Sequence, residues 1–126
     1  MKIAALISRI LLGLLFVFFG LNGLHPFLPQ PPVPDGLVGQ FMTVFFASHW
    51  VQVIASLQVI SGLLLLLNRY PVLGLVLLGP ILFNILTFHI LLAPQGIGPG
   101  LVATILWFIL FAHYRQHLAG IFVQKP

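Results

Sequence analysis

The sequence predicts an all-α protein, a four-helix transmembrane bundle with a short interfacial helix between spans one and two. Of the 126 residues, 60% are hydrophobic and only 5% are charged, whereas soluble domains carry about 25% charged residues. So few charges cannot cover a surface that faces water. The apolar runs are continuous rather than alternating, which favours helices over a barrel. We expect one membrane domain, residues 1–126.

Four apolar runs approach the length of about 20 residues that a spanning helix needs. The predicted spans cover residues 3–24, 50–67, 72–92 and 97–114. In the first span, Gly13 and Gly20 lie seven residues apart, with Gly23 beyond them. Small residues at such spacing are typical of close helix contacts in membranes. We therefore expect the first span to approach a neighbouring helix closely.

The connection between the first two spans is long and has two parts. Residues 26–36 are rich in proline, which disfavours regular structure, so we expect an irregular segment outside the hydrocarbon core. In residues 37–49, Gln40, Thr43 and Ala47 fall on one side of a helix and apolar residues on the other. This pattern predicts a short amphipathic helix with a break near residues 48–50. Placement in the membrane interface and re-entrant packing against the bundle both remain open.

Orientation follows from the distribution of Lys and Arg, which favour the cytoplasmic side. The basic residues that flank the spans all fall on one side: Lys2, Arg69, Arg115 and Lys125. The opposite side holds the only acidic residue, Asp35. Arg9 lies about two turns inside the first span, from where its side chain can extend back toward the cytoplasmic face. Both termini are therefore predicted to be cytoplasmic.

Several kinds of chemistry are excluded by the residues that are missing. The chain has no cysteine, which removes thiol–disulfide chemistry, cysteine-bound zinc, iron–sulfur clusters and covalently attached haem. No span contains a carboxylate, so an acidic proton relay is absent, as is the membrane glutamate of small four-helix drug exporters. A lone Asp35 does not support a serine-based triad. The five basic residues are too scattered for a nucleic-acid surface.

Polar residues from three spans are predicted to meet near the outer face. They are Asn22, His25, His49, Gln58, Asn84 and His89. Gln58 and Asn84 each lie about 8 residues from the outer end of a span, at a depth of about 12 Å. Because polar groups in hydrocarbon favour the bundle interior, we expect an outward-opening cavity with His89 at its rim. The alternative is that these residues make interhelical hydrogen bonds, worth about 0.6 kcal/mol each.

His113 and His117 have an i, i+4 spacing that can bind a metal. Their position beside Arg115 at the end of the last span is more typical of an interfacial helix end. We therefore predict no metal site.

The order of landmarks resembles the DoxX-like family of small four-helix bacterial membrane proteins. The resemblance is carried by residues 9–16 with 20–25, by residues 59–70 around Ser61-Gly62-Leu63-Leu64, and by residues 80–89. It implies a multi-pass protein of the bacterial inner membrane. Some relatives are named as membrane subunits of thiosulfate:quinone oxidoreductase, and others are linked to redox or oxidative-stress complexes. The family often has an acid before the glycine of span two, where this chain has Gln58, which implies that a proton step is missing.

Two functions follow from these observations. In the first, the protein is a membrane subunit of a quinone-linked redox system. Gln58 and Asn84 would then bind a ligand carbonyl, and His25, His49 or His89 would exchange protons near neutral pH. The implied cofactor is a quinone, and a partner redox subunit would carry the electrons. In the second, the protein is a non-enzymatic membrane anchor or assembly factor. The lipid bilayer is a partner in both cases, and homo-oligomerisation remains open.

Overall fold

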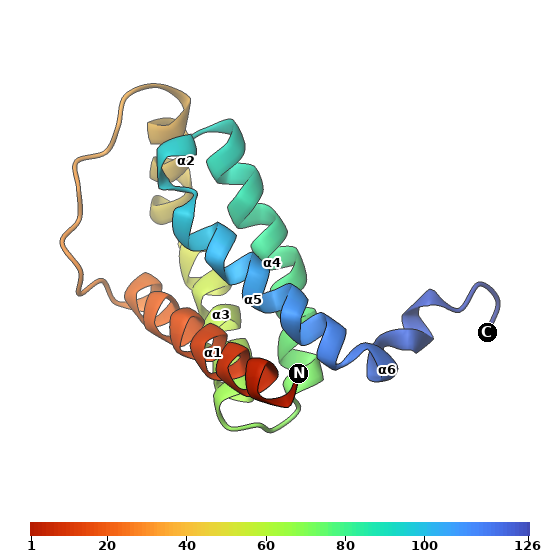
Figure 1. Ribbon diagram of the computed structural model, residues 1–126. Helices are drawn as coiled ribbons and strands as arrows, with labels where there is room; N and C mark the ends of the chain where they lie inside the picture. Colours follow the sequence, from red (N-terminus) through yellow and green to blue (C-terminus); the bar gives the residue numbers. More distant parts are fainter.

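The computed structural model describes residues 1–126, and its regular elements are all helices. They are α1 (Lys2–Leu24), α2 (Gly36–Ala47), α3 (Trp50–Leu66), α4 (Pro71–Leu91), η1 (Pro94–Gly96), α5 (Gly98–His113), α6 (Arg115–Leu118) and η2 (Ala119–Phe122). Figure 1 shows α1, α3, α4 and α5 packed side by side, with α2 beside the far end of α4. The all-α prediction is confirmed.

Two helices are long and apolar enough to cross a membrane by themselves, and they are α1 with 23 residues and α4 with 21. The pair α2 and α3 passes the same test together, although a bend of 77° separates its two members. The chain therefore has two helices of spanning character, or three if the bent pair is one span. Helix α5 is apolar but has 16 residues, or about 24 Å at 1.5 Å per residue.

The break between α2 and α3 falls at Ser48 and His49, within the predicted region. His49 has a φ of 65°, in the left-handed region that commonly follows the end of a helix. The hydroxyl of Ser48 donates to the Phe45 carbonyl and also accepts the N–H of Trp50. The local turn therefore redirects the chain by 77°. The irregular conformation predicted for residues 26–36 is confirmed up to Asp35, and Gly36 already begins α2.

Helices α1 and α3 are in backbone contact along a seam of glycines. A Cβ atom on Gly13 would lie 2.9 Å from the carbonyl oxygen of Gly62, and one on Gly62 would lie 2.8 Å from that of Gly13. Farther along, a Cβ on Gly20 would lie 3.0 Å from the Ala55 oxygen. Such distances leave no room for a side chain. The close contact predicted for the first span is thus confirmed, and its partner is α3.

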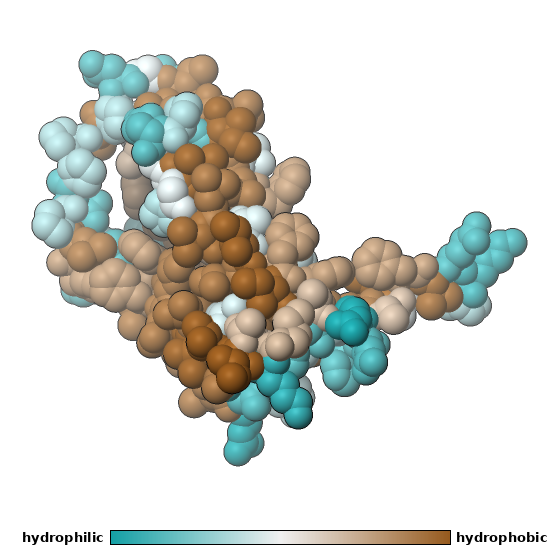
Figure 2. Space-filling model, viewed as in Figure 1, coloured by the Kyte–Doolittle hydropathy of each residue, from teal (hydrophilic) through white to brown (hydrophobic).

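The core lies where the four long helices meet. Its fully buried leucines come from each of them: Leu12, Leu65, Leu75, Leu78 and Leu110. Most other large apolar side chains point outward, and Ile3 and Phe83 are 74% and 71% exposed. Figure 2 shows this apolar surface over the helices, with hydrophilic residues mainly at the helix ends, in the connections and at the C-terminus. A continuous apolar exterior of this kind is compatible with lipid and unusual for a soluble monomer.

A tryptophan side chain of α5 forms a hydrogen bond to the backbone of α4. The indole N–H of Trp107 donates to the Leu75 carbonyl across 2.8 Å. This hydrogen bond joins α5 to α4.

Candidate functional site: a cavity with three amides

The bundle has two chemically different ends. Figure 1 shows the N-terminus, the α3–α4 turn and α6 at one end, which we name the basic end because it holds Lys2, Arg69 and Arg115. At the other end lie η1 and the start of α2, next to Asp35. This is the Asp35 end.

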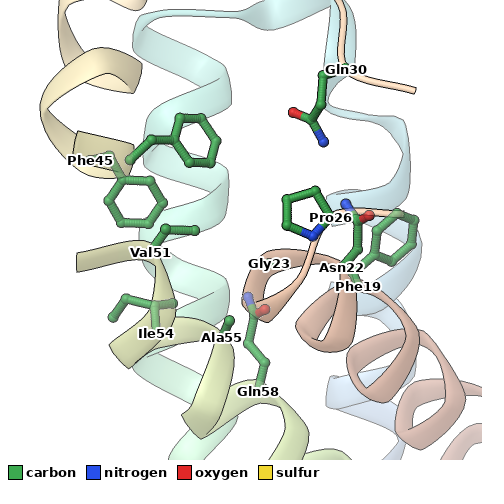
Figure 3. Close-up of a pocket in the computed structure, with 11 residues that line it drawn as sticks. Phe19, Asn22, Gly23, Pro26, Gln30, Phe45, Val51, Ile54, Ala55 and Gln58 are labelled. Carbon is green, nitrogen blue, oxygen red and sulfur yellow. The ribbon is translucent and has the colours of Figure 1, made fainter. Parts of the chain in front are cut away.

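A cavity of about 200 Å³ lies between α1 and α3, on their halves nearer the Asp35 end. Three side-chain amides line it, those of Asn22, Gln30 and Gln58. Its apolar lining includes three aromatic rings, those of Phe19, Phe45 and Phe46. Figure 3 shows the amides of Gln58 and Gln30 directed into the space from opposite sides, with Asn22 beside Pro26.

The local structure explains why a hollow forms there. A Cβ on Gly23 would lie 2.8 Å from that of Ala55, so α1 and α3 are still in close contact beside the cavity. Above this contact, α1 ends at Leu24 and the chain leaves the helix pair. The bend between α2 and α3 brings Phe45 to one side, where its ring lies 5.9 Å from that of Trp50. The cavity is the partly open space between the diverging segments.

Asn22 has a structural task as well as a place in the lining. Its Oδ1 accepts hydrogen bonds from the backbone N–H groups of Phe27 and Leu28, both at 3.0 Å. Two backbone donors require an acceptor, so this contact fixes which atom of the amide is the oxygen. The Nδ2 group of Asn22 is therefore the atom that remains to donate to a ligand.

The structure brings together two of the six residues predicted to form the cavity. Asn22 and Gln58 both line it, whereas His25, His49, Asn84 and His89 do not. His25 follows α1 as an exposed residue. His49 is exposed in the bend, and its Nδ1 lies 2.9 Å from Oε1 of Gln52.

The two predicted residues of α4 both contact backbone carbonyls that are four residues away in the chain. The exposed Asn84 donates its Nδ2 to the Pro80 carbonyl at 2.9 Å. His89 is half-buried, with its Nδ1 3.3 Å from the Ala93 carbonyl oxygen. The cavity belongs to α1, α3 and their connection, and α4 contributes nothing to its lining. The prediction that spans one, two and three share one cavity therefore requires correction for α4, because depth alone does not set the rotation of a helix.

Several other polar side chains of the apolar helices also bond to their own helix. Ser56, Thr87 and Thr104 donate to the carbonyls of Gln52, Phe83 and Gly100, four residues earlier in each case. This is the usual way in which a hydroxyl is satisfied within a helix. Asn84 follows the same pattern and therefore does not make the interhelical hydrogen bond that the alternative interpretation predicts.

The interhelical bonds come instead from two residues that sequence reasoning did not select for this role. Besides Trp107, Arg9 reaches from α1 to the last turn of α3, where its Nη1 donates to the carbonyls of Leu65 and Leu66. A cation at a helix C-terminus interacts favourably with carbonyls that have no helical donor. Arg9 was expected to extend to the membrane surface. It does extend toward the basic end, but it is held there by protein carbonyls.

Sequence reasoning also missed Gln30, which lies in the proline-rich connection. Nothing in the sequence distinguishes it from the other exposed polar residues of that segment. Its place in the cavity depends on the path of the loop, which the Asn22 hydrogen bonds direct. Phe45 and Phe46 were missed for a similar reason, since their position depends on the bend after α2.

The lining indicates the kind of chemistry that the cavity supports. Amides donate and accept hydrogen bonds without carrying charge, and aromatic walls favour a flat apolar group. None of the lining residues is titratable at neutral pH. Across the chain, no group of three or more His, Cys, Asp or Glu side chains is placed to hold a metal ion. The amide and aromatic lining is complementary to a neutral molecule.

No protein-family model, curated protein or solved structure matches the chain. The resemblance to DoxX-like proteins consequently stays a prediction.

Proposed function

We propose that the protein is a DoxX-like membrane protein with four spans that holds the head of a neutral ligand, with a quinone as the leading candidate. The observation that carries this proposal is the cavity in which Asn22, Gln30 and Gln58 surround a space lined by aromatic rings. A quinone head is flat, uncharged and bears two carbonyl oxygens, so amide N–H donors and aromatic walls complement it.

The four-span arrangement joins the bent pair α2–α3 and the short helix α5 to the two long helices. Helix α5 is apolar but has only 16 residues, so as a fourth span it would require local thinning of the bilayer. The basic end would face the cytoplasm of a bacterial inner membrane. Reporter fusions after Asp35 and at Lys125 should then report opposite sides, and the same side for both would refute this topology.

The volume of the cavity limits what it can bind. Sites for drug-sized ligands occupy about 300–1,000 Å³, and this one has about 200 Å³. It can therefore enclose a ring-sized head, while the rest of a longer molecule would extend into lipid. The protein would act as a binding subunit in a redox system, with a partner subunit carrying the electrons. The histidines have no part in this proposal, because none lines the cavity.

A matched pair of variants tests the proposal. Gln58→Leu removes an amide from the cavity, whereas Asn84→Leu removes an amide that is exposed and bonded within α4. Binding of a short-tailed ubiquinone to the protein purified in mild detergent should weaken about 3- to 10-fold in the first, which corresponds to the loss of one hydrogen bond. It should stay unchanged in the second. Equal effects of the two variants, or no binding by the unmodified protein, would refute the quinone proposal.

A second candidate function is a non-enzymatic anchor or assembly factor. It is supported by the polar side chains that bond within their own helices. Four of them each donate to a carbonyl four residues earlier and need no ligand: Ser56, Thr87, Thr104 and Asn84. Purification in mild detergent distinguishes the two functions. An anchor should retain partner proteins, and its lipid extract should contain no quinone above the level of the surrounding membrane.

A further inference from the structure

The chain leaves the bundle after α6. Leu118 is buried and belongs to the core cluster, together with the half-buried Tyr114 and Phe111 that pack against it. All residues from 119 to 126 are exposed. We name residues 119–126 the C-terminal arm. Figure 1 shows the arm projecting sideways from the basic end instead of continuing along α5. Leu118 is therefore the last buried residue of the chain.

The arm carries three consecutive large apolar side chains. Ile121, Phe122 and Val123 are 67%, 71% and 54% exposed. Figure 2 shows apolar surface along the projecting segment and hydrophilic surface at its tip. Exposing such a group to water is unfavourable, and the bundle offers it little cover beyond an edge contact of Phe122 with Phe111, with ring centroids 6.5 Å apart.

Positive charge lies on both sides of this apolar group. Arg115 precedes it and Lys125 follows it, and both are exposed. Nη1 of Arg115 donates to the Ala112 carbonyl across 2.7 Å, which holds the guanidinium at the base of the arm. The only acidic side chain of the protein, Asp35, is at the opposite end. The apolar group and its flanking cations therefore match the two layers of an anionic membrane surface.

We propose that the C-terminal arm lies in the membrane interface at the basic end, with Ile121, Phe122 and Val123 among the upper acyl chains and Arg115 and Lys125 at anionic phosphates. The sideways direction of the arm keeps it near the plane of a membrane that the long helices cross. This inference rests on the membrane placement of the bundle. It is independent of any ligand in the cavity.

The test uses the absence of cysteine from the chain. A spin label on Gln124→Cys reports the arm, and the same label on Gln95→Cys reports an exposed residue of η1 at the Asp35 end. The protein is reconstituted in phosphatidylcholine vesicles with about 30% phosphatidylglycerol. We expect the label at position 124 to lose at least half of its collisions with a water-soluble nickel chelate relative to position 95, and to keep its collisions with oxygen.

Two further changes separate the apolar and ionic parts of the proposal. In the label background at Gln124, Phe122→Gln should raise nickel collisions toward the level at Gln95. Arg115→Gln combined with Lys125→Gln should do the same in anionic vesicles and have a smaller effect in pure phosphatidylcholine.

Nickel collisions at position 124 that equal those at position 95 in anionic vesicles would place the arm in water and overturn the proposal. Low collisions with both oxygen and nickel, with spin–spin broadening, would overturn it in favour of contact between copies of the chain. Circular dichroism of each labelled protein verifies that the bundle is folded, so a folding failure is not mistaken for either result.

Discussion

The glycine seam between α1 and α3 makes a sharp prediction for Gly62→Ala. The added Cβ would lie 2.8 Å from the Gly13 carbonyl oxygen and 2.9 Å from the Val17 backbone nitrogen. Both neighbours are backbone atoms, so neither can rotate away as a side chain does. Ordinary contact begins near 3.4 Å, and the two helices must therefore separate by about half an ångström. A gap of that size forfeits about a quarter of the dispersion attraction of the atoms affected.

The magnitude follows from two opposing effects. Overpacking of a close interface costs about 1–3 kcal/mol, whereas replacing a helical glycine by alanine contributes about 1 kcal/mol in favour of the helix. Because two close neighbours of the added Cβ are backbone atoms, we expect an overpacking cost of about 2–3 kcal/mol. After the helix contribution of about 1 kcal/mol is subtracted, Gly62→Ala should lower the free energy of unfolding by about 1–2 kcal/mol. The assay is titration of the purified protein from mild detergent into sodium dodecyl sulfate, followed by far-ultraviolet circular dichroism.

Gly100→Ala is the matched control, because it makes the same change in α5. There the added Cβ would meet only methyl groups, Ile85 Cγ2 at 3.3 Å and Leu86 Cδ2 at 3.5 Å. These side-chain ends can shift, so the helix preference of alanine should offset the contact and leave stability within about 1 kcal/mol of the unmodified protein. If Gly62→Ala is as stable as Gly100→Ala, the inference that backbone contact holds α1 against α3 is wrong.

Two further predictions concern the interhelical hydrogen bonds. Arg9→Leu should lower the free energy of unfolding by about 1.5–3 kcal/mol in the same titration, because it removes charged hydrogen bonds to the α3 C-terminus. Arg9→Lys should restore only part of that stability, since an ammonium lacks the guanidinium's fork of donors. Full stability of Arg9→Leu would show that solvent or lipid satisfies those carbonyls equally well. Trp107→Phe should cost about 1 kcal/mol through loss of the bond to Leu75, and an unchanged unfolding midpoint would argue against that bond.

The candidate site was only partly predictable. Asn22 and Gln58 were expected to face a common cavity and do so, because each lies on the side of its helix that meets the α1–α3 seam. Asn84 lies about as many residues from the end of its predicted span as Gln58 does, but it is on an exposed side of α4. Its span is apolar on all sides, so the sequence contains no pattern that sets the rotation of that helix. Gln30 was unpredictable because only the path of the loop brings it to the cavity.

The sequence by itself determined the features that depend on neighbouring residues. Apolar runs gave the positions of the helices, prolines gave the irregular segment after α1, and the glycines of α1 gave its close contact. These are local properties of backbone freedom and side-chain size. The tertiary structure alone decided that α3 is the partner of those glycines, that Arg9 ends on the carbonyls of Leu65 and Leu66, and that the cavity excludes α4. The physical reason is that helices surrounded by apolar side chains can rotate with little change in burial until backbone contacts and a few long-range hydrogen bonds select one packing.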